Sequence, residues 1–192
     1  TTSGVYSVVI TDTVTGCIST SASGTVTINA IPTVTVNSPT NCGVSALVTA
    51  APGAAGTYTY TWTVPSGTNP GNVASFNAAV SGAYTVTVTN ASGCTSLPAN
   101  STVTINPNPT VTVNSPTVCG VNATVTATPG AAGTYTYVWT VPSGATNPGN
   151  VNTFVTTTSG SYSVVITDTV TGCFSTSASG TVTINAIPTV TV

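Results

Sequence analysis

Residues 81–94 read SGAYTVTVTNASGC, and this stretch decides the fold class of the chain. Tyr84, Val86 and Val88 alternate with threonines over its first half. Successive side chains of a β-strand point to opposite faces, so the alternation predicts a strand with one apolar face in the core and one threonine face in water. The run Asn-Ala-Ser-Gly that follows is rich in turn residues and ends the strand.

Similar short runs of Val, Ile, Thr and Tyr occur on both sides of this strand, separated by Pro, Gly, Asn and Ser at intervals of roughly ten residues. Regular spacing of this kind is typical of an all-β sandwich. We expect strands at 33–36, 45–50, 57–64, 73–78, 83–89 and 101–105. The predicted fold class is therefore all-β, built from β-sandwich domains.

The first residues of the chain recur near its end. Residues 157–192 copy residues 1–36 at an offset of 156. The two copies differ only at Val5 against Ser161 and at Ile18 against Phe174. Self-similarity at a fixed period is the sequence signature of a tandem repeat array.

A more diverged copy lies between these two. SGAYTVTVTNASGC repeats the passage that ends in TGC, and GTYTYTWTVPSG at 56–67 recurs as GTYTYVWTVPSG at 133–144. The prolines that set the register, at steps of 77 and 79 residues, are Pro32, Pro109 and Pro188. The chain is therefore predicted to be a linear array of repeats.

This register predicts four segments. We expect the C-terminal part of a truncated repeat at 1–31, complete β-sandwich repeats at 32–108 and 109–188, and the first strand of a following repeat at 189–192. Two or three strands do not bury a core alone. We therefore interpret the sequence as a window cut from a longer polymer of repeats.

Each complete repeat contains one tryptophan, Trp62 or Trp139, in the middle of a predicted strand. We predict that these indoles pack between two sheets as core anchors, together with Tyr84 and Tyr162. The alternative is that the tryptophans form an exposed platform on which a sugar ring stacks.

The charge of the chain restricts its partners. It contains no Lys, Arg or His and only two acidic residues, so its formal net charge is −2. Binding of nucleic acid or of anionic lipid relies on Lys and Arg. We expect no nucleic-acid partner and no membrane insertion by this segment, in which no apolar run reaches about 18 residues.

The chain contains almost no side chains suited to catalysis. Without His, Lys, Arg or Glu the chain lacks the usual general bases and Schiff-base amines, and its two aspartates lie in separate repeats. We expect no enzyme activity, no catalytic residue and no cofactor. We also expect no metal site, because the cysteines are not spaced as C-x-x-C and calcium sites need several carboxylates.

The strand sequences resemble a known family. YTWTVPSG at 60–67 and FNAAVSGAYTVTVTNASGC at 76–94 resemble strands of polycystic-kidney-disease (PKD) and related immunoglobulin-like domains. With NCG at 41–43 they are similar to the repeats of gliding-motility adhesins and other large cell-surface proteins of Bacteroidota. The resemblance covers both complete repeats and the partial one, and it implies a stalk or filament module of a secreted surface protein.

One loop departs from that family. VPSGTNPGN at 64–72 stands where PKD domains have a Gly-Asp-Gly turn. No feature that depends on the aspartate of that turn is therefore carried over to this chain.

Each complete repeat contains two cysteines and the partial repeat one, and the five are Cys17, Cys42, Cys94, Cys119 and Cys173. In an exported protein such pairs suggest disulfides. One pairing lies within repeats, Cys42 with Cys94 and Cys119 with Cys173, and the other crosses the junction, Cys42 with Cys173. In an immunoglobulin topology Cys42 and Cys94 would lie at opposite ends of the domain, more than roughly 20 Å apart, whereas a disulfide requires about 4.4 to 6.8 Å between Cα atoms. The sequence leaves both pairings open.

The two acidic residues, Asp12 and Asp168, occupy equivalent positions in TDTVTG, and each is predicted to hydrogen-bond the backbone of its own turn. In the Bacteroidota proteins that the repeats resemble, Asp-Thr followed by an aliphatic residue is also an O-glycosylation motif, which implies sugars on Thr13 and Thr169. Asn-x-Ser/Thr sequons add the candidate glycosylation sites Asn90, Asn100 and Asn122.

The lack of charged residues also bears on whether copies of the chain associate with one another. Many β-proteins protect their strand edges with Lys and other charged residues, and this chain cannot. A neutral, threonine-covered surface predicts self-association into filaments or a long tandem chain. The leading hypothesis is a non-catalytic structural repeat segment of an extracellular filament or cell-surface adhesin stalk. The alternative is a module that binds surface glycans through exposed Tyr and Trp.

Overall fold

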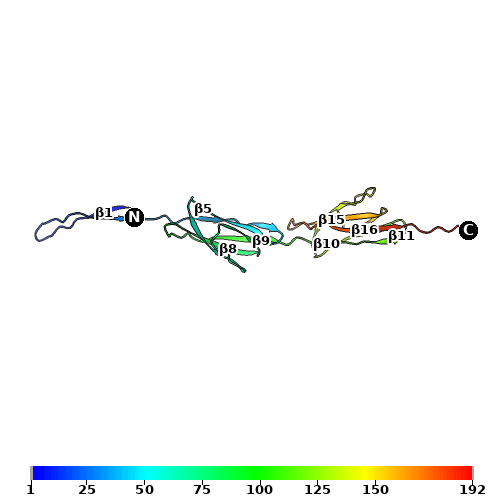
Figure 1. The fold of residues 1–192 in the computed structure, drawn as a ribbon, viewed down its shortest axis with the longest axis horizontal. Helices are drawn as coiled ribbons and strands as arrows, with labels where there is room; N and C mark the ends of the chain where they lie inside the picture. Colours follow the sequence, from blue (N-terminus) through cyan, green and yellow to red (C-terminus); the bar gives the residue numbers. More distant parts are fainter. Residues whose placement is uncertain (1, 192) are drawn as a thin grey trace. The chain divides into compact units, whose positions relative to one another are not determined.

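The structure is a computed structural model that describes residues 2–191. These residues form sixteen β-strands and no helix (Figure 1). Backbone contacts divide the chain into two compact units, of which the second contains the segments Ser38–Val48 and Asn77–Gly82 together with Thr102 and the residues after it. The prediction of an all-β chain is confirmed.

The first two strands form a separate hairpin. β1 (Gly4–Val8) and β2 (Ala22–Val26) pair antiparallel with Gly4 opposite Val26. Every side chain of both strands is exposed. The alternating pattern is therefore present here without a core.

The second repeat in the sequence forms two sheets. Its strands are β3 (Val34–Val36), β4 (Thr40–Cys42), β5 (Ala46–Pro52), β6 (Tyr58–Thr63), β7 (Ser75–Ala78), β8 (Gly82–Asn90) and β9 (Ala99–Asn106). The three-stranded sheet has the order β3-β5-β7 and the four-stranded sheet the order β4-β9-β8-β6.

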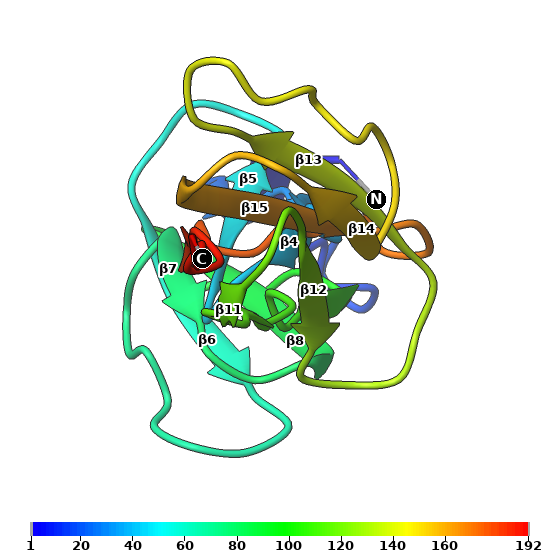
Figure 2. The same cartoon turned by 90° about the vertical axis from the view of Figure 1, so that its right-hand side faces the viewer.

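The third repeat forms the same two sheets again. Its strands are β10 (Val111–Val113), β11 (Thr117–Cys119), β12 (Ala123–Pro129), β13 (Tyr135–Thr140), β14 (Thr153–Thr156), β15 (Gly160–Asp168) and β16 (Ala178–Asn185). The orders are β10-β12-β14 and β11-β16-β15-β13. Figure 2 shows β13 and β15 side by side, as their antiparallel pairing requires.

The core of the third repeat lies between these two sheets. Its buried residues are Ala123, Val125, Ala127, Trp139, Tyr162, Val164, Ile166 and Val182. The Trp139 and Phe154 rings meet edge to face with their centroids 5.0 Å apart, and Phe154 also contacts Tyr162. Such aromatic contacts add stability beyond the area that they bury.

The first unit contains the equivalent aromatic group. Trp62 and Phe76 meet edge to face at 4.9 Å, and the Phe76 and Tyr84 centroids lie 5.9 Å apart. The same aromatic residues at the same places in two repeats reproduce the same ring arrangement, because the spacing of the strands fixes which rings can meet.

The strand predictions agree with the structure apart from shifts of at most two residues at their ends. Tyr84, Val86 and Val88 are buried as predicted. The threonines of the other face of β8 are half-buried rather than fully exposed. The predicted repeat boundaries stay predictions, and the predicted segment 189–192 ends outside the described residues.

One kind of strand was not predicted. β4 and β11 each have three residues and pair parallel to β9 and β16, with Cys42 opposite Asn106 and Cys119 opposite Asn185. Three residues are too few to show an alternating pattern, so nothing local in the sequence identified them. These two short strands carry a cysteine each.

Candidate functional site: the Cys42–Cys173 junction

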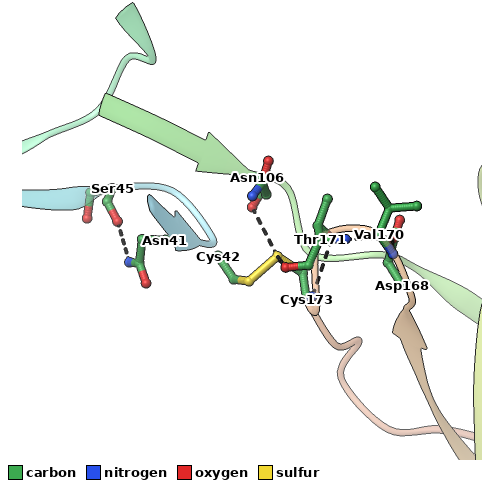
Figure 3. Close-up of a disulfide and its surroundings, with 8 residues drawn as sticks. All are labelled: Asn41, Cys42, Ser45, Asn106, Asp168, Val170, Thr171 and Cys173. Carbon is green, nitrogen blue, oxygen red and sulfur yellow. Dashed lines mark hydrogen bonds between the residues drawn. A yellow bond between two sulfur atoms is a disulfide. The ribbon is translucent and has the colours of Figure 1, made fainter. Parts of the chain in front are cut away.

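A disulfide joins two successive repeats of the sequence. Cys42 belongs to the second repeat and Cys173 to the third, and their sulfur atoms are bonded (Figure 3). The two Cα atoms are 5.5 Å apart, within the range that disulfides need, and the residues are 131 positions apart in sequence. Of the two pairings that the sequence left open, the structure therefore contains the one across the junction.

The within-repeat pairing does not occur in the structure. Cys94 and Cys119, the partners that it requires, are free cysteines, and Cys17 is also free. With Cys42 and Cys173 bonded to each other, the pairs Cys42 with Cys94 and Cys119 with Cys173 are both excluded here. The reason is topological: Cys42 ends β4 opposite Asn106, whereas the Cys94 sulfur lies 3.9 Å from the Asn29 carbonyl.

Strand pairing and a glycine position Cys42. The N–H of Gly43 donates to the carbonyl of Asn106 at 2.9 Å, which continues the pairing of β4 with β9 by one residue. Gly43 has φ +108°, a conformation that other residues rarely adopt. The Asn41 side chain donates to the carbonyl of Ser45 and holds the chain as it turns towards β5 (Figure 3).

A compact turn positions Cys173. A carboxylate oxygen of Asp168 accepts the N–H of Val170 at 2.7 Å and the N–H of Thr171 at 3.0 Å. The carbonyl of Cys173 accepts the N–H of Asp168 at 2.8 Å, which closes the turn. The predicted role of this aspartate in its own turn agrees with these bonds.

The turn also changes the acidity of its aspartate. The Thr171 N–H and then the Val170 N–H stabilise the charged carboxylate and lower the pKa of Asp168 below its ordinary value. In the equivalent turn, the Thr15 hydroxyl and the Val14 N–H lower the pKa of Asp12 in the same way. The effect is local to the TDTVTG sequence.

The backbone carbonyl of Asn106 is the point at which the two sides of the junction meet. It accepts the Gly43 N–H and lies 3.9 Å from the Cys173 sulfur, the contact drawn in Figure 3. Cys173 is fully buried. Cys42 is half-buried, so the bridge is covered on its Cys173 side and partly accessible on its Cys42 side.

Asn106 and Gly43 were not identified from the sequence. A signal for both was available, because the asparagine recurs as Asn29 and Asn185, and the Cys-Gly pair recurs as Cys119-Gly120. Neither recurrence indicates a contact between the two residues unless the pairing of β4 with β9 is already known.

The tryptophans are buried. Trp62 and Trp139 are each 3% exposed, and their indole N–H groups donate to the carbonyls of Val73 and Val151. Tyr84 and Tyr162 are buried beside them. A sugar-stacking platform needs an exposed indole face, so the alternative based on these tryptophans does not fit the structure.

The candidate glycosylation sites differ in accessibility. Thr13, Thr169, Asn100 and Asn122 are exposed, whereas Asn90 is half-buried. The Asn90 amide N–H donates to the carbonyl of Ala30, and its side-chain oxygen accepts the N–H of Cys94. A sugar on that amide nitrogen would replace this hydrogen bond, and a sugar on Thr169 would replace the bond from its hydroxyl to the carbonyl of Thr134. By this criterion Asn90 and Thr169 are the least suitable of the five.

Two features are absent from residues 2–191. No three side chains among His, Cys, Asp and Glu come together in a way that could hold a metal ion. No helix in this part of the chain is long and apolar enough to cross a membrane.

Comparison with solved structures identifies the fold. Extracellular domains 3–5 of Drosophila OTK are similar with a TM-score of 0.52, at 14% identity over 95% of this chain and 71% of that chain. Titin domains I67–I69 give a TM-score of 0.43 at 14% identity over 83% and 67% of the two chains. The N-terminal four immunoglobulin domains of Dscam1 give 0.36 at 15% identity over 91% and 53%.

The chain consists of tandem immunoglobulin-like β-sandwiches, and at these identities the likeness concerns the fold alone. No protein-family model matches the sequence, and neither does any of the curated proteins compared with it.

Proposed function

We propose that the chain is a non-catalytic structural repeat segment of an extracellular filament or cell-surface adhesin stalk. The observation that carries the proposal is the disulfide between Cys42 and Cys173, which ties one repeat to the next. A domain that works alone has no use for a covalent bond to its neighbour. A stalk under tension benefits from it, because the junctions are where a chain of domains would otherwise yield.

An extracellular location is part of this proposal. Disulfides persist in oxidising environments and are rare in reducing ones. The OTK structure that shares the fold is described as extracellular. The resemblance to surface repeats of Bacteroidota and the O-glycosylation motifs at Thr13 and Thr169 support the same location.

Self-association is the partner interaction that we propose. The chain has a formal net charge of −2 and no basic residue, so charge repulsion between copies is weak. Exposed strands carry rows of threonine, as in β6, where every second residue from Thr59 is an exposed threonine. Such surfaces associate through hydroxyl hydrogen bonds and methyl contacts, with little dependence on salt.

Single-molecule stretching of the chain by its two ends tests the structural role. While the disulfide is intact, the 131-residue separation between Cys42 and Cys173 cannot extend. At about 3.6 Å per extended residue, reduction should release on the order of 470 Å of additional length. The control is the double variant Cys42→Ser/Cys173→Ser, which should reach the long extension without reductant.

Two results would overturn the proposal. One is a chain that extends as freely as an unfolded polypeptide before reduction, because a stalk has to resist tension. The other is an unreduced chain that already reaches the full extension of the double variant, because the bridge would then bear no load.

A further inference from the structure

The two sheets of the third repeat end in β13 and β14. β13 is the edge strand of the four-stranded sheet, and β14 is the edge strand of the three-stranded sheet. At the opposite edges, β10 contacts β15 and β16, and β11 has only three residues. An edge strand presents N–H and C=O groups that a further strand can pair with, and this chain has no Lys or Arg to block them.

Two asparagines of one loop cover the free side of β13. The side-chain oxygen of Asn150 accepts the N–H of Tyr137 at 2.7 Å. The side-chain N–H of Asn147 donates to the carbonyl of Trp139 at 2.9 Å. A neighbouring strand would need these same backbone groups. The second repeat covers β6 in the same way with two asparagines of its own, so this uncharged chain protects one of its edges with side-chain amides.

The free side of β14 has no such cover. The N–H of Ala127 donates to the carbonyl of Asn152 at 2.8 Å, so these two residues form a hydrogen-bonded pair in the antiparallel ladder of β12 and β14. Hydrogen-bonded pairs alternate along such a ladder. Phe154 therefore bonds to β12, whereas the N–H and C=O groups of Thr153 and Val155 point to the free side. No loop or side chain of residues 2–191 bonds to these four groups.

A small cleft lies at the end of this edge. Its volume is about 140 Å³, and it is lined by Gly144 and Thr146 of the neighbouring loop and by the residues 155–158. Val155 itself is 62% exposed. The space beside the end of β14 is thus accessible to an extended chain.

The equivalent edge of the second repeat is also accessible. β7 is the edge strand of its sheet, and Ser75 and Asn77, which align with Thr153 and Val155, are exposed. The second repeat has further repeat sequence both before and after it. The accessible edge is therefore a property of the repeat and does not depend on its place in the chain.

The sequence of β14 suits pairing with a second copy of itself. Thr153–Thr156 reads TFVT, in which every residue is β-branched or aromatic and favours a strand. The second repeat has Asn77 at the position of Val155, and asparagine disfavours strands. β14 carries no charge, so two copies meet without repulsion, whereas a charged strand of another protein would find no opposite charge here.

We propose that β14 of one chain pairs antiparallel with β14 of a second chain and joins the two chains side by side. The two-fold axis passes beside Phe154, so Thr153 of each copy lies opposite Val155 of the other. Each of these two pairs exchanges two backbone hydrogen bonds, which satisfies all the free groups of both strands. The contact is the same on both chains, as in most pairs of identical molecules.

The proposal rests on the self-association proposed above and names the surface that makes it. A contact between two strands of four residues is small, and small interfaces are weak. We therefore expect a dimer that forms only in concentrated solution. A longer chain that carries this edge in many repeats would gain affinity from their number.

Amide hydrogen exchange, measured by NMR over a range of protein concentrations, tests the pairing residue by residue. The N–H groups of Thr153 and Val155 should exchange at least about tenfold more slowly in concentrated than in dilute solution, because only the dimer supplies their acceptors. The N–H of Phe154 bonds to β12 in both states and is the internal control.

Matched substitutions separate the edge of β14 from the threonine rows on the sheet faces. Val155 and Val138 are 62% and 66% exposed, and Val138 lies on β13, whose edge is covered. Val155→Lys should raise the dissociation constant of the dimer at least about tenfold, because it brings like charges together across the two-fold axis. Val138→Lys should leave it unchanged. Sedimentation equilibrium measures both.

A second variant removes the donor itself. Val155→Pro deletes an N–H that the pairing with β12 does not use, so an edge strand tolerates it. It should weaken the dimer at least about tenfold, because each copy loses one of the hydrogen bonds between the chains.

Two results would overturn the edge pairing. One is a chain that stays monomeric up to about 1 mM. The other is a dimer that survives both Val155 variants or that Val138→Lys weakens as strongly, because the contact would then lie on the threonine rows. In that second case self-association stands and only the edge pairing fails. The stretching experiment concerns a single chain and is independent of both results.

Discussion

Residues 4–26 and 160–182 have almost the same sequence and the same strand pairing, yet their side chains lie in opposite environments. Tyr6 faces Gly24 across the first pair, and Tyr162 faces Gly180 across the second. Tyr6 is 52% exposed and Tyr162 is 0% exposed. The pairing is thus encoded within the passage itself, whereas burial is supplied by strands elsewhere in the chain.

The turn between the strands is the second feature that survives without a core. Both copies close with an aspartate that accepts two N–H groups of its own loop. Local hydrogen bonds and a glycine at positive φ are sufficient to form it. Equivalent substitutions in the two copies can therefore separate what the passage encodes from what the surrounding core adds.

The largest difference is expected at the cysteines. The double variant Cys42→Ser/Cys173→Ser should lower the free energy of unfolding by about 5 kcal/mol, because the bridge closes a loop defined by a separation of 131 residues. Cys17→Ser, at the position equivalent to Cys173, should leave that free energy unchanged in the monomer. Urea denaturation without reductant measures both, and an equal loss in the two variants would contradict the expectation.

The next difference concerns an isoleucine. Ile166 is fully buried and Ile10 is 71% exposed. Ile166→Ala should cost about 2–5 kcal/mol of the free energy of unfolding, since it removes buried methyl groups and leaves a cavity. Ile10→Ala should change it by less than about 0.5 kcal/mol. The comparison breaks down if Ile10→Ala destabilises the chain as much as Ile166→Ala does.

A smaller difference is expected at the tyrosine hydroxyls, which make the same local bond in both copies. The Tyr162 hydroxyl donates to the carbonyl of Thr158 at 2.9 Å, and that of Tyr6 donates to the carbonyl of Thr2 at 2.8 Å. Tyr162→Phe should cost about 1–2 kcal/mol, because the half-buried carbonyl of Thr158 loses its donor and the buried hydroxyl of Thr156 loses the Tyr162 oxygen 2.6 Å away. In Tyr6→Phe water replaces the hydroxyl, so the denaturation midpoint should not move.

The smallest difference is expected at the aspartates. Their pKa values are both lowered by hydrogen bonds from their own turns. A lowered folded pKa means that the turn is stabilised above the ordinary aspartate pKa and loses this stabilisation as the pH falls through the lowered value. Carboxyl carbon NMR titration should find both Asp12 and Asp168 below the ordinary value, and a normal pKa at Asp12 would show that its turn needs the core.

The difference between the two copies also shows which structural features the sequence could predict. The alternation in SGAYTVTVTNASGC correctly predicted which residues of β8 are buried, because its covering strands are also present. The similar alternation in the hairpin lies within the truncated repeat at 1–31, for which the sequence predicts no core, and the side chains of β1 and β2 are exposed. The fold class follows from a strand pattern that recurs along the chain. Burial depends in addition on which other strands cover each strand.

The disulfide shows a second limit of the sequence. Its spacing allowed two pairings, and the choice depended on the parallel pairing of β4 with β9, where Thr40 faces Thr104. A three-residue strand with a partner so far along the chain leaves no pattern for sequence analysis to detect. Trp62 and Trp139 were easier to interpret, because large aromatic residues within an alternating strand are usually buried.

The bridge between Cys42 and Cys173 also has a consequence for the order of events as the chain is made. A chain is synthesised from its N-terminus, so in the extracellular location proposed above Cys42 and Cys94 reach an oxidising environment before Cys173 does. Early domains fold while later ones are still being synthesised. We therefore expect the second repeat to fold first, with Cys94 beside Asn29 as in the finished structure rather than bonded to Cys42. The Cys42 thiol of the second repeat then stays unpaired until the third repeat supplies Cys173 and the disulfide forms.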